Sequence, residues 1–104
     1  MKKVLVRYRI KSDKVAENEQ LVKEVYKQLH EKQIEGLRYS TVKLEDGVTF
    51  VHIAHHENEQ VSKELSSLPA FKKFTENIDD RCDELPLVSS VSVIGSYNFI
   101  WDRN

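Results

Sequence analysis

Apolar and polar residues alternate at the beginning of the chain. Between residues 3 and 10, Val4, Val6, Tyr8 and Ile10 lie on one side and Lys3, Leu5, Arg7 and Arg9 on the other. A period of two, carried by β-branched and aromatic residues, is typical of a β-strand. We therefore predict a first strand at residues 3–10.

The next apolar residues recur at helical spacing. They are Val15, Val22, Val25, Tyr26 and Leu29, and lysine, glutamate and glutamine fill the opposite side. This pattern predicts an amphipathic helix. Ser12 and Asp13 offer an N-cap at its start. The helix is expected to end near Ile34, before Gly36.

A hairpin follows this helix. Residues 37–44 alternate as a second strand, and Glu45, Asp46 and Gly47 supply a short turn, because Asp and Gly tolerate positive φ. The returning strand, Asp46 to His56, is apolar on both faces and carries histidines along its length. Such a strand needs cover on two sides, and a short chain has little material for the second side. A partner chain or a bound ligand is therefore indicated.

The second half of the chain predicts a short helix and then a longer one. The short helix is indicated by Val61, Leu65 and Leu68, and it breaks at Ser66 and Ser67. Ser67 can cap the longer helix, and Pro69 is tolerated in its first turn. Its apolar face would consist of Phe71, Phe74, Ile78 and Cys82. In that position Cys82 is a small buried hydrophobe and not a nucleophile.

The last element is a strand. Leu85 and Pro86 are expected to stop the second helix, and residues 87–101 are then rich in valine, serine and aromatic residues. We predict a long strand over residues 87–101, with a bulge at Gly95.

The order β-α-β-β-α-β predicts a four-stranded antiparallel sheet with two helices on one face. This is the α+β, ferredoxin-like architecture, and a chain of 104 residues is expected to form a single domain over residues 1–104. Two large functional classes use it. RNA-recognition modules bind RNA on the open sheet face, whereas dimeric α+β barrels pack two open faces together.

The third strand has a partial likeness to the RNA-recognition fingerprint, at Gly47, Phe50 and Val51. Where that pattern requires a basic residue and two stacking aromatics, the chain has Asp46, Val48 and Leu5. Stacking contributes about 1–3 kcal/mol per base, so much of the expected affinity is lost. With 16 basic and 17 acidic residues, the net charge of −1 adds no general attraction. We expect no nucleic-acid partner.

The location is indicated by what the chain lacks. No apolar run in the sequence is long enough for a signal peptide or a membrane span. A lone cysteine cannot form an internal disulfide, which agrees with a reducing compartment. We expect a cytoplasmic protein with no membrane partner.

The run Ser67-Leu-Pro-Ala-Phe-Lys-Lys-Phe74 resembles the start of the second long helix in antibiotic-biosynthesis-monooxygenase-like proteins of the dimeric α+β barrel superfamily. The order of elements is similar over nearly the whole chain. The resemblance implies a homodimer whose open sheet faces bury one another, with a small pocket in each protomer. It also implies a cofactor-independent, monooxygenase-like enzyme acting on a small aromatic or apolar molecule. The alternative is a non-catalytic ligand-binding or stress-associated dimer.

Several positions depart from that family. The third strand of the family commonly ends with a Glu and a Trp, and this chain has Ala54 and His56 at those positions. The family also often has two histidines near the proline, and this chain has Leu65 and Ala70 in their place. The first strand also contains no Asn, which haem-degrading members use together with a Trp and a His. Haem degradation is therefore not expected, and we expect no cofactor.

The histidines are also candidate metal ligands. In a strand, His52 and His56 share a face at a separation of roughly 13 Å, while His55 points the opposite way. One zinc ion cannot be held by this set within one chain, so no metal is expected, although a site completed across a dimer axis stays open. His55 and His56 are expected at the solvent-exposed end of the strand.

His52 is the candidate catalytic residue. Alternation places it beside Val48 and Phe50, on the face that we assign as open, together with Leu5, Arg7 and Arg9 of the first strand. His52 can act as a general base or bind a substrate oxygen, or it can be a polar residue satisfied across the dimer interface. The predicted ligand-binding residues are Arg7, Phe50 and His52.

Two further groups of side chains stay ambiguous. Arg7 and Arg9 can orient an anionic ligand or pair with acidic groups of a second protomer. The tyrosines Tyr8, Tyr26 and Tyr39 can offer hydroxyl groups to a ligand, although amphipathic packing explains them equally well.

Overall fold

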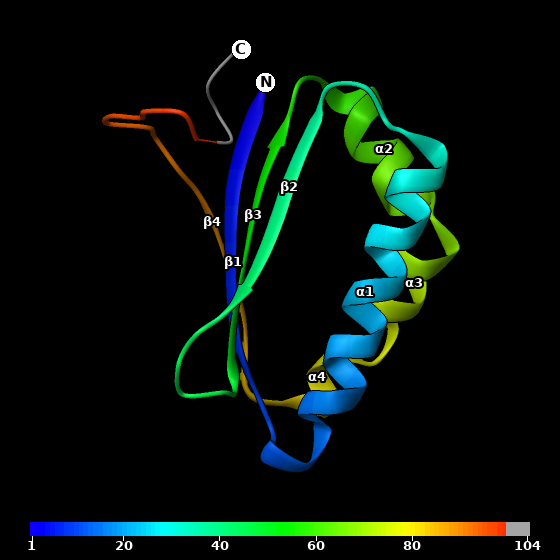
Figure 1. The fold of residues 1–104 in the computed structure, drawn as a ribbon, viewed down its shortest axis with the longest axis vertical. Coiled ribbons are helices and arrows are strands. Elements are labelled where there is room, and N and C mark those ends of the chain that lie inside the picture. Colours follow the sequence, from blue (N-terminus) through cyan, green and yellow to red (C-terminus); the bar gives the residue numbers. More distant parts are fainter. Residues whose placement is uncertain (100–104) are drawn as a thin grey trace.

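In the computed structural model, which describes residues 1–99, helices cover one face of a four-stranded antiparallel sheet (Figure 1). The strands are β1 (Lys2–Ile10), β2 (Leu37–Lys43), β3 (Thr49–His56) and β4 (Cys82–Ser90), in the order β2-β3-β1-β4. The helices are the 3-10 turn η1 (Ser12–Lys14) and α1 (Val15–Lys32), α2 (Glu59–Ser67), α3 (Pro69–Glu76) and α4 (Ile78–Arg81). The predicted α+β, ferredoxin-like fold is confirmed.

The first helix forms as predicted, but its caps differ. Ser12 and Asp13 lie inside the η1 turn, and the residue before α1 is Lys14, which gives no side-chain cap. At the other end, Gln33 adopts a left-handed conformation with φ of 53° and donates its backbone N–H to the Leu29 carbonyl. This capping bond ends the helix close to the predicted position.

The hairpin turn forms where the sequence predicts it. Gly47 has a φ of 78°, which favours glycine, and its N–H donates to the Leu44 carbonyl. The Asp46 carboxylate accepts the backbone N–H groups of Val48 and Thr49, each at 2.9 Å. These bonds hold the turn, so β3 begins at Thr49 and not at Asp46.

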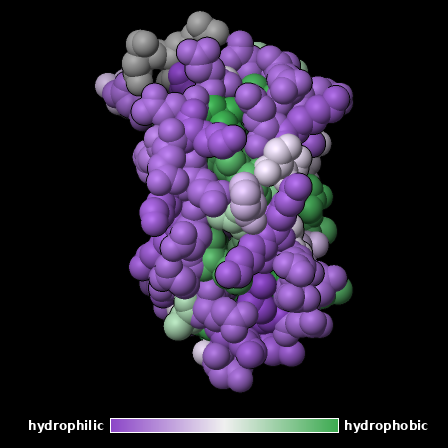
Figure 2. Space-filling model, turned by 90° about the vertical axis from the view of Figure 1, so that its right-hand side faces the viewer, coloured by the Kyte–Doolittle hydropathy of each residue, from purple (hydrophilic) through white to green (hydrophobic). Residues whose placement is uncertain are grey.

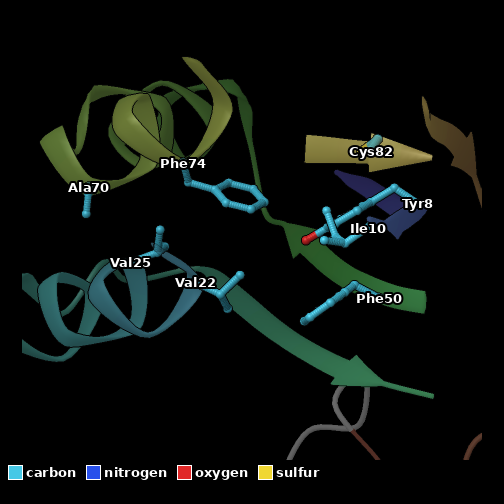
Figure 3. Close-up of a cluster of buried hydrophobic side chains, with 8 residues drawn as sticks. All are labelled: Tyr8, Ile10, Val22, Val25, Phe50, Ala70, Phe74 and Cys82. Atoms are coloured by element: carbon cyan, nitrogen blue, oxygen red, sulfur yellow. The ribbon is translucent and has the colours of Figure 1, made fainter. Parts of the chain in front are cut away.

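The predicted second helix is wrong beyond its first turns. Ser67 does not cap it, because its hydroxyl donates to the Lys63 carbonyl at 2.6 Å and belongs to the end of α2. Pro69 does begin α3, where its missing N–H has no cost. The helical path then breaks at Asn77, and Cys82 opens β4 instead of lying on a helix (Figure 3). Cys82 is nevertheless buried, as expected.

The last strand also differs from the prediction. β4 covers Cys82–Ser90 and pairs with β1, whereas residues 91–99 form no strand and residues 100 and 101 lie outside the described part. The pairing with β1 shifts register twice, between Leu87 and Glu84 and again between Glu84 and Cys82, so the irregularities lie on either side of Glu84 and not at Gly95. An edge strand with a bulge accommodates a proline that has no N–H to donate.

The core lies between the sheet and α1 and α3. Tyr8 and Ile10 of β1 and Phe50 of β3 extend from the sheet toward Val22 and Val25 of α1, Ala70 and Phe74 of α3 (Figure 3). The outer side of the helical layer is mostly hydrophilic, with apolar atoms in a central strip (Figure 2). Among the helices within residues 1–99, none is long and apolar enough to cross a membrane.

Candidate functional site

An apolar cavity of about 280 Å³ lies between the sheet and the helical layer. Its walls come from all four strands and from α2, α3 and α4, and most of its lining is aliphatic or aromatic, including Val6, Leu65, Phe71 and Val88. The polar groups at its surface include His52 of β3 and the hydroxyl-bearing Tyr8 and Tyr39 of β1 and β2. An apolar cavity with a few convergent polar groups is the usual form of a small-molecule site.

His52 stands at the centre of these polar groups. It is 4% exposed, and its ring stacks on Phe74 at a centroid distance of 5.3 Å. Its Nε2 lies 2.7 Å from the Tyr8 hydroxyl, while its Nδ1 lies 2.8 Å from the Tyr39 hydroxyl and 3.1 Å from that of Thr41. Both ring nitrogens are therefore hydrogen-bonded within the chain.

The structure corrects the face on which this site was expected. Phe50 pairs with Tyr8 and His52 with Val6, so Phe50 and His52 point toward the helices. Arg7 pairs with Val51 and is exposed on the opposite, open face, so it does not meet His52. Val48 precedes β3. The prediction of one shared open face is wrong because both faces of β3 are apolar, and alternation alone cannot show which face the helices cover.

Burial controls the protonation of the site. It lowers the pKa of His52 to about 4, so the imidazole is neutral at pH 7. Burial also raises the pKa of Tyr8 and of Tyr39 well above their ordinary value, so both hydroxyls keep their protons. The cavity therefore has a neutral imidazole flanked by protonated phenols.

A second group of buried polar side chains adjoins this site, and it was not predicted from the sequence. Asn18 of α1 is fully buried and donates from Nδ2 to the Tyr8 hydroxyl at 3.0 Å. Its Oδ1 accepts from Nε of Arg81 at 3.2 Å. Arg81 is 3% exposed and donates from Nη2 to the Phe74 carbonyl at 2.6 Å. Asn18 lies four residues before Val22, within the apolar stripe of α1. A polar residue in that stripe was the sequence feature that could have indicated a buried polar group.

Of the other histidines, His56 also lines the cavity. It is buried on the same side of the sheet as His52, and its Nδ1 lies 2.9 Å from the Ser62 hydroxyl. The expectation of an exposed His56 is therefore wrong. His55 pairs with Lys3 on the opposite face, as predicted. Within residues 1–99, no three side chains of the His, Cys, Asp and Glu types are placed to share a metal ion.

Comparison with known proteins gives matches only at the level of structure. No family model and no curated protein matches the sequence. A putative antibiotic biosynthesis monooxygenase from Nitrosomonas europaea superposes with a TM-score of 0.75 at 13% identity, over 91% of this chain and 100% of that one. A second, from Bacteroides thetaiotaomicron, gives 0.71 at 20% identity, over 89% of each chain.

The chain has the same fold as these solved structures. SnoaB, a cofactor-independent oxygenase from Streptomyces nogalater, also shares this fold, with a TM-score of 0.68 at 12% identity over 93% of this chain and 96% of SnoaB. The resemblance to antibiotic-biosynthesis-monooxygenase-like proteins is thus confirmed at the level of the fold. At these identities the likeness gives the architecture, and the activity has to be argued from the site.

The lowered pKa of His52 predicts a pH dependence of stability. A pKa of about 4 in the folded state, against an ordinary 6.5, means that the unfolded chain binds the proton more readily between these values. This contribution is fully present above pH 6.5 and is lost as the pH falls toward 4. Between pH 7.5 and 4.5 we expect His52 to account for about 2–3 kcal/mol of lost unfolding free energy.

Urea unfolding of native protein and of a His52→Gln variant at the two pH values measures this contribution. Between pH 7.5 and 4.5, the unfolding free energy should decrease by about 2–3 kcal/mol less in His52→Gln than in the native protein. His30→Gln is the matched control, because His30 is exposed on α1, and it should follow the native curve. An equal decrease in His52→Gln and native protein would show that the His52 pKa is not lowered.

Proposed function

We propose that the cavity binds a small aromatic or apolar molecule and that the protein is a cofactor-independent, monooxygenase-like enzyme acting on it. The observation that carries this proposal is the buried, neutral His52, hydrogen-bonded to two tyrosines at the wall of an apolar cavity. A cavity of about 150 Å³ is known to hold benzene. The 280 Å³ present here is large enough for one ring or two fused rings.

The chemistry of the site fits oxygenation of a phenol. Conversion of a phenol to a quinone consumes one O₂ and releases one water, whose hydrogens come from the ring carbon and the hydroxyl group. The substrate supplies all the electrons, and the protein has to exclude water and manage the hydroxyl proton. The apolar walls of the cavity would exclude water. The His52–Tyr39 pair would manage the hydroxyl proton by hydrogen-bonding the substrate oxygen.

A non-catalytic ligand-binding protein is the second candidate. It is favoured by one observation, namely that both nitrogens of His52 already have hydroxyl partners within the chain. A base that is fully hydrogen-bonded needs a rearrangement before it can accept a proton from a ligand. In a binding protein the same bonds would simply satisfy a buried imidazole.

Oxygen uptake separates the two candidates. Native protein is supplied with a panel of substituted phenols and naphthols, and uptake is recorded with an oxygen electrode while binding is measured by equilibrium dialysis. If the protein is an oxygenase, His52→Gln should reduce the rate by about a hundredfold or more. His30→Gln should not change it, because His30 lies outside the cavity. Saturable binding without oxygen uptake would identify a binding protein.

The open face of the sheet supports a homodimer as part of this proposal. The apolar side chains on that face are Leu5, Val42, Val51, Ile53 and Leu87. Leu87 is 66% exposed and Val42 is 47% exposed. Residues 91–99 project from the end of β4 on the side away from the helices, and Ile94 and Tyr97 are almost fully exposed there (Figure 1). A second copy of the chain would cover both regions.

Arg7 has a place in this arrangement. It lies on the open face beside Leu87, so we propose that it contributes to the contact between protomers and not to the cavity. Arg9, on the same face, pairs with Glu84 at 3.4 Å within its own chain. The proposal keeps the cytoplasmic location expected from the sequence, in which the lone thiol of Cys82 stays reduced.

A further inference from the structure

The buried chain from Arg81 to His52 contains two groups that can only donate hydrogen bonds. A guanidinium has no acceptor atom, so the bond from Arg81 Nε fixes which end of the Asn18 amide is the oxygen. The amide nitrogen of Asn18 is then directed at the Tyr8 hydroxyl, 3.0 Å away. The Asn18 amide orientation, which is often ambiguous in proteins, is therefore determined here.

The orientation of Asn18 sets the direction of the next bond. An amide N–H can only donate, so the Tyr8 oxygen accepts from Asn18. The remaining hydrogen of the Tyr8 hydroxyl is free to be donated to Nε2 of His52, at 2.7 Å. A nitrogen that accepts this bond carries no proton of its own. In a neutral imidazole, the proton then lies on Nδ1.

We infer that Arg81 and Asn18 are positioning residues that act through Tyr8 to hold His52 in its Nδ1-protonated tautomer, so that the cavity selects ligands with an acceptor oxygen. The ligand class is an aromatic compound with an acceptor oxygen, either a carbonyl oxygen or the hydroxyl oxygen of a phenol. This assignment of ligand class rests on the proposed function of the cavity, whereas the tautomer does not.

The consequence for the cavity follows from the contacts of Nδ1. Its proton is donated to the hydroxyl oxygen of Tyr39 at 2.8 Å or to that of Thr41 at 3.1 Å. Once Tyr39 accepts from His52, its own hydroxyl hydrogen is left for another acceptor, which is either its hydrogen-bond partner Thr41 or a ligand oxygen in the cavity that Tyr39 lines. A ligand oxygen beside Tyr39 would receive this hydrogen bond. The opposite tautomer would instead draw the Tyr39 hydrogen toward Nδ1 and present only an acceptor.

The burial of Arg81 supports the same arrangement. Within residues 1–99 no carboxylate forms an ion pair with Arg81, although it is 3% exposed. Its charge is instead met by the Asn18 and Phe74 oxygens and by the Phe74 ring, 5.6 Å from the guanidinium carbon. A buried cation of this kind makes Asn18 a stronger donor to Tyr8 and favours electron density on the Tyr8 oxygen.

Nitrogen-15 NMR of ring-labelled histidine tests the tautomer in the unliganded protein at pH 7. The His52 signals are assigned by their absence from His52→Gln. We expect Nδ1 to be protonated and Nε2 to be unprotonated in the native protein. A proton on Nε2 in the native spectrum would overturn the inference without the use of any further variant.

Asn18→Asp provides the sharper test, because a carboxylate can accept from Arg81 and Tyr8 but cannot donate to Tyr8. The Tyr8 hydroxyl would then donate to Asp and accept from His52, so the His52 proton should move from Nδ1 to Nε2. Asn18→Leu removes the amide without supplying an acceptor and controls for loss of packing. A folded Asn18→Asp protein that keeps Nδ1 protonated would show that Asn18 does not set the tautomer.

The ligand class is tested with 1-indanone and indane, which differ by one acceptor oxygen. We expect native protein to bind 1-indanone about two- to tenfold more tightly than indane, and Tyr39→Phe to abolish this difference. Equal binding of the two probes, or no binding of either, would overturn the ligand assignment. None of these measurements involves oxygen uptake, so a failure of the oxygenase proposal can be distinguished from a failure of this inference.

Discussion

Replacement of Phe74 by alanine is expected to lower the free energy of unfolding by about 3–5 kcal/mol. Phe74 is 4% exposed and lies between the core and the cavity. Its ring is 5.3 Å from that of His52, 6.3 Å from that of Tyr8 and 6.1 Å from that of Phe71, and it lies under the Arg81 guanidinium. Truncation would therefore remove packing from the core and from the buried polar chain at the same time.

Urea unfolding at a fixed protein concentration measures this effect, since the stability of the proposed dimer would depend on concentration. Phe74→Leu retains most of the apolar volume and should cost less than half as much. Phe71→Ala is a second comparison, because Phe71 lies on the same helix but is only half-buried. A loss below about 1 kcal/mol in Phe74→Ala would mean that α3 does not pack on the sheet as the structure shows.

The parts of the fold that could be predicted from sequence are those determined by neighbouring residues. The β2–β3 turn follows from Asp46 and Gly47, and α1 follows from its apolar stripe. The segment from Cys82 to Pro86, which forms the first part of β4, has no such local signal. It contains acidic residues and a proline, and it becomes a strand because β1 offers an edge with which to pair. Tertiary pairing therefore overrides the local preference of this segment.

The candidate site was predictable to the same limited extent. His52 could be singled out because its side chain titrates near neutrality and lies in an apolar strand. Its partners could not be found, because Tyr8 lies 44 residues away and the Asn18–Arg81 bond joins residues 63 apart. Arg7 was misassigned for a related reason. Strand alternation gives two faces, but only the packing of the helices shows which one is covered.

Introduction of a charge on the open face is expected to have the largest effect on assembly. Ile53 pairs with Leu5 on one side and with Ser40 on the other, so it lies in the middle of the face proposed to bind a second copy. In a two-fold symmetric dimer an Ile53→Glu substitution is present twice. If each glutamate weakens the dimer by about 2 kcal/mol, the dissociation constant of the dimer should rise about a thousandfold.

Sedimentation velocity over a range of concentrations measures this change. Native protein should sediment as a dimer at micromolar concentration and Ile53→Glu as a folded monomer, because Ile53 points away from the helix-covered core. Gln60→Glu adds the same charge at an exposed position on α2 and should leave the dimer intact. A native monomer at micromolar concentration would contradict the proposed dimer. The apolar open face and the projecting residues 91–99 would then have to be covered by some other molecule.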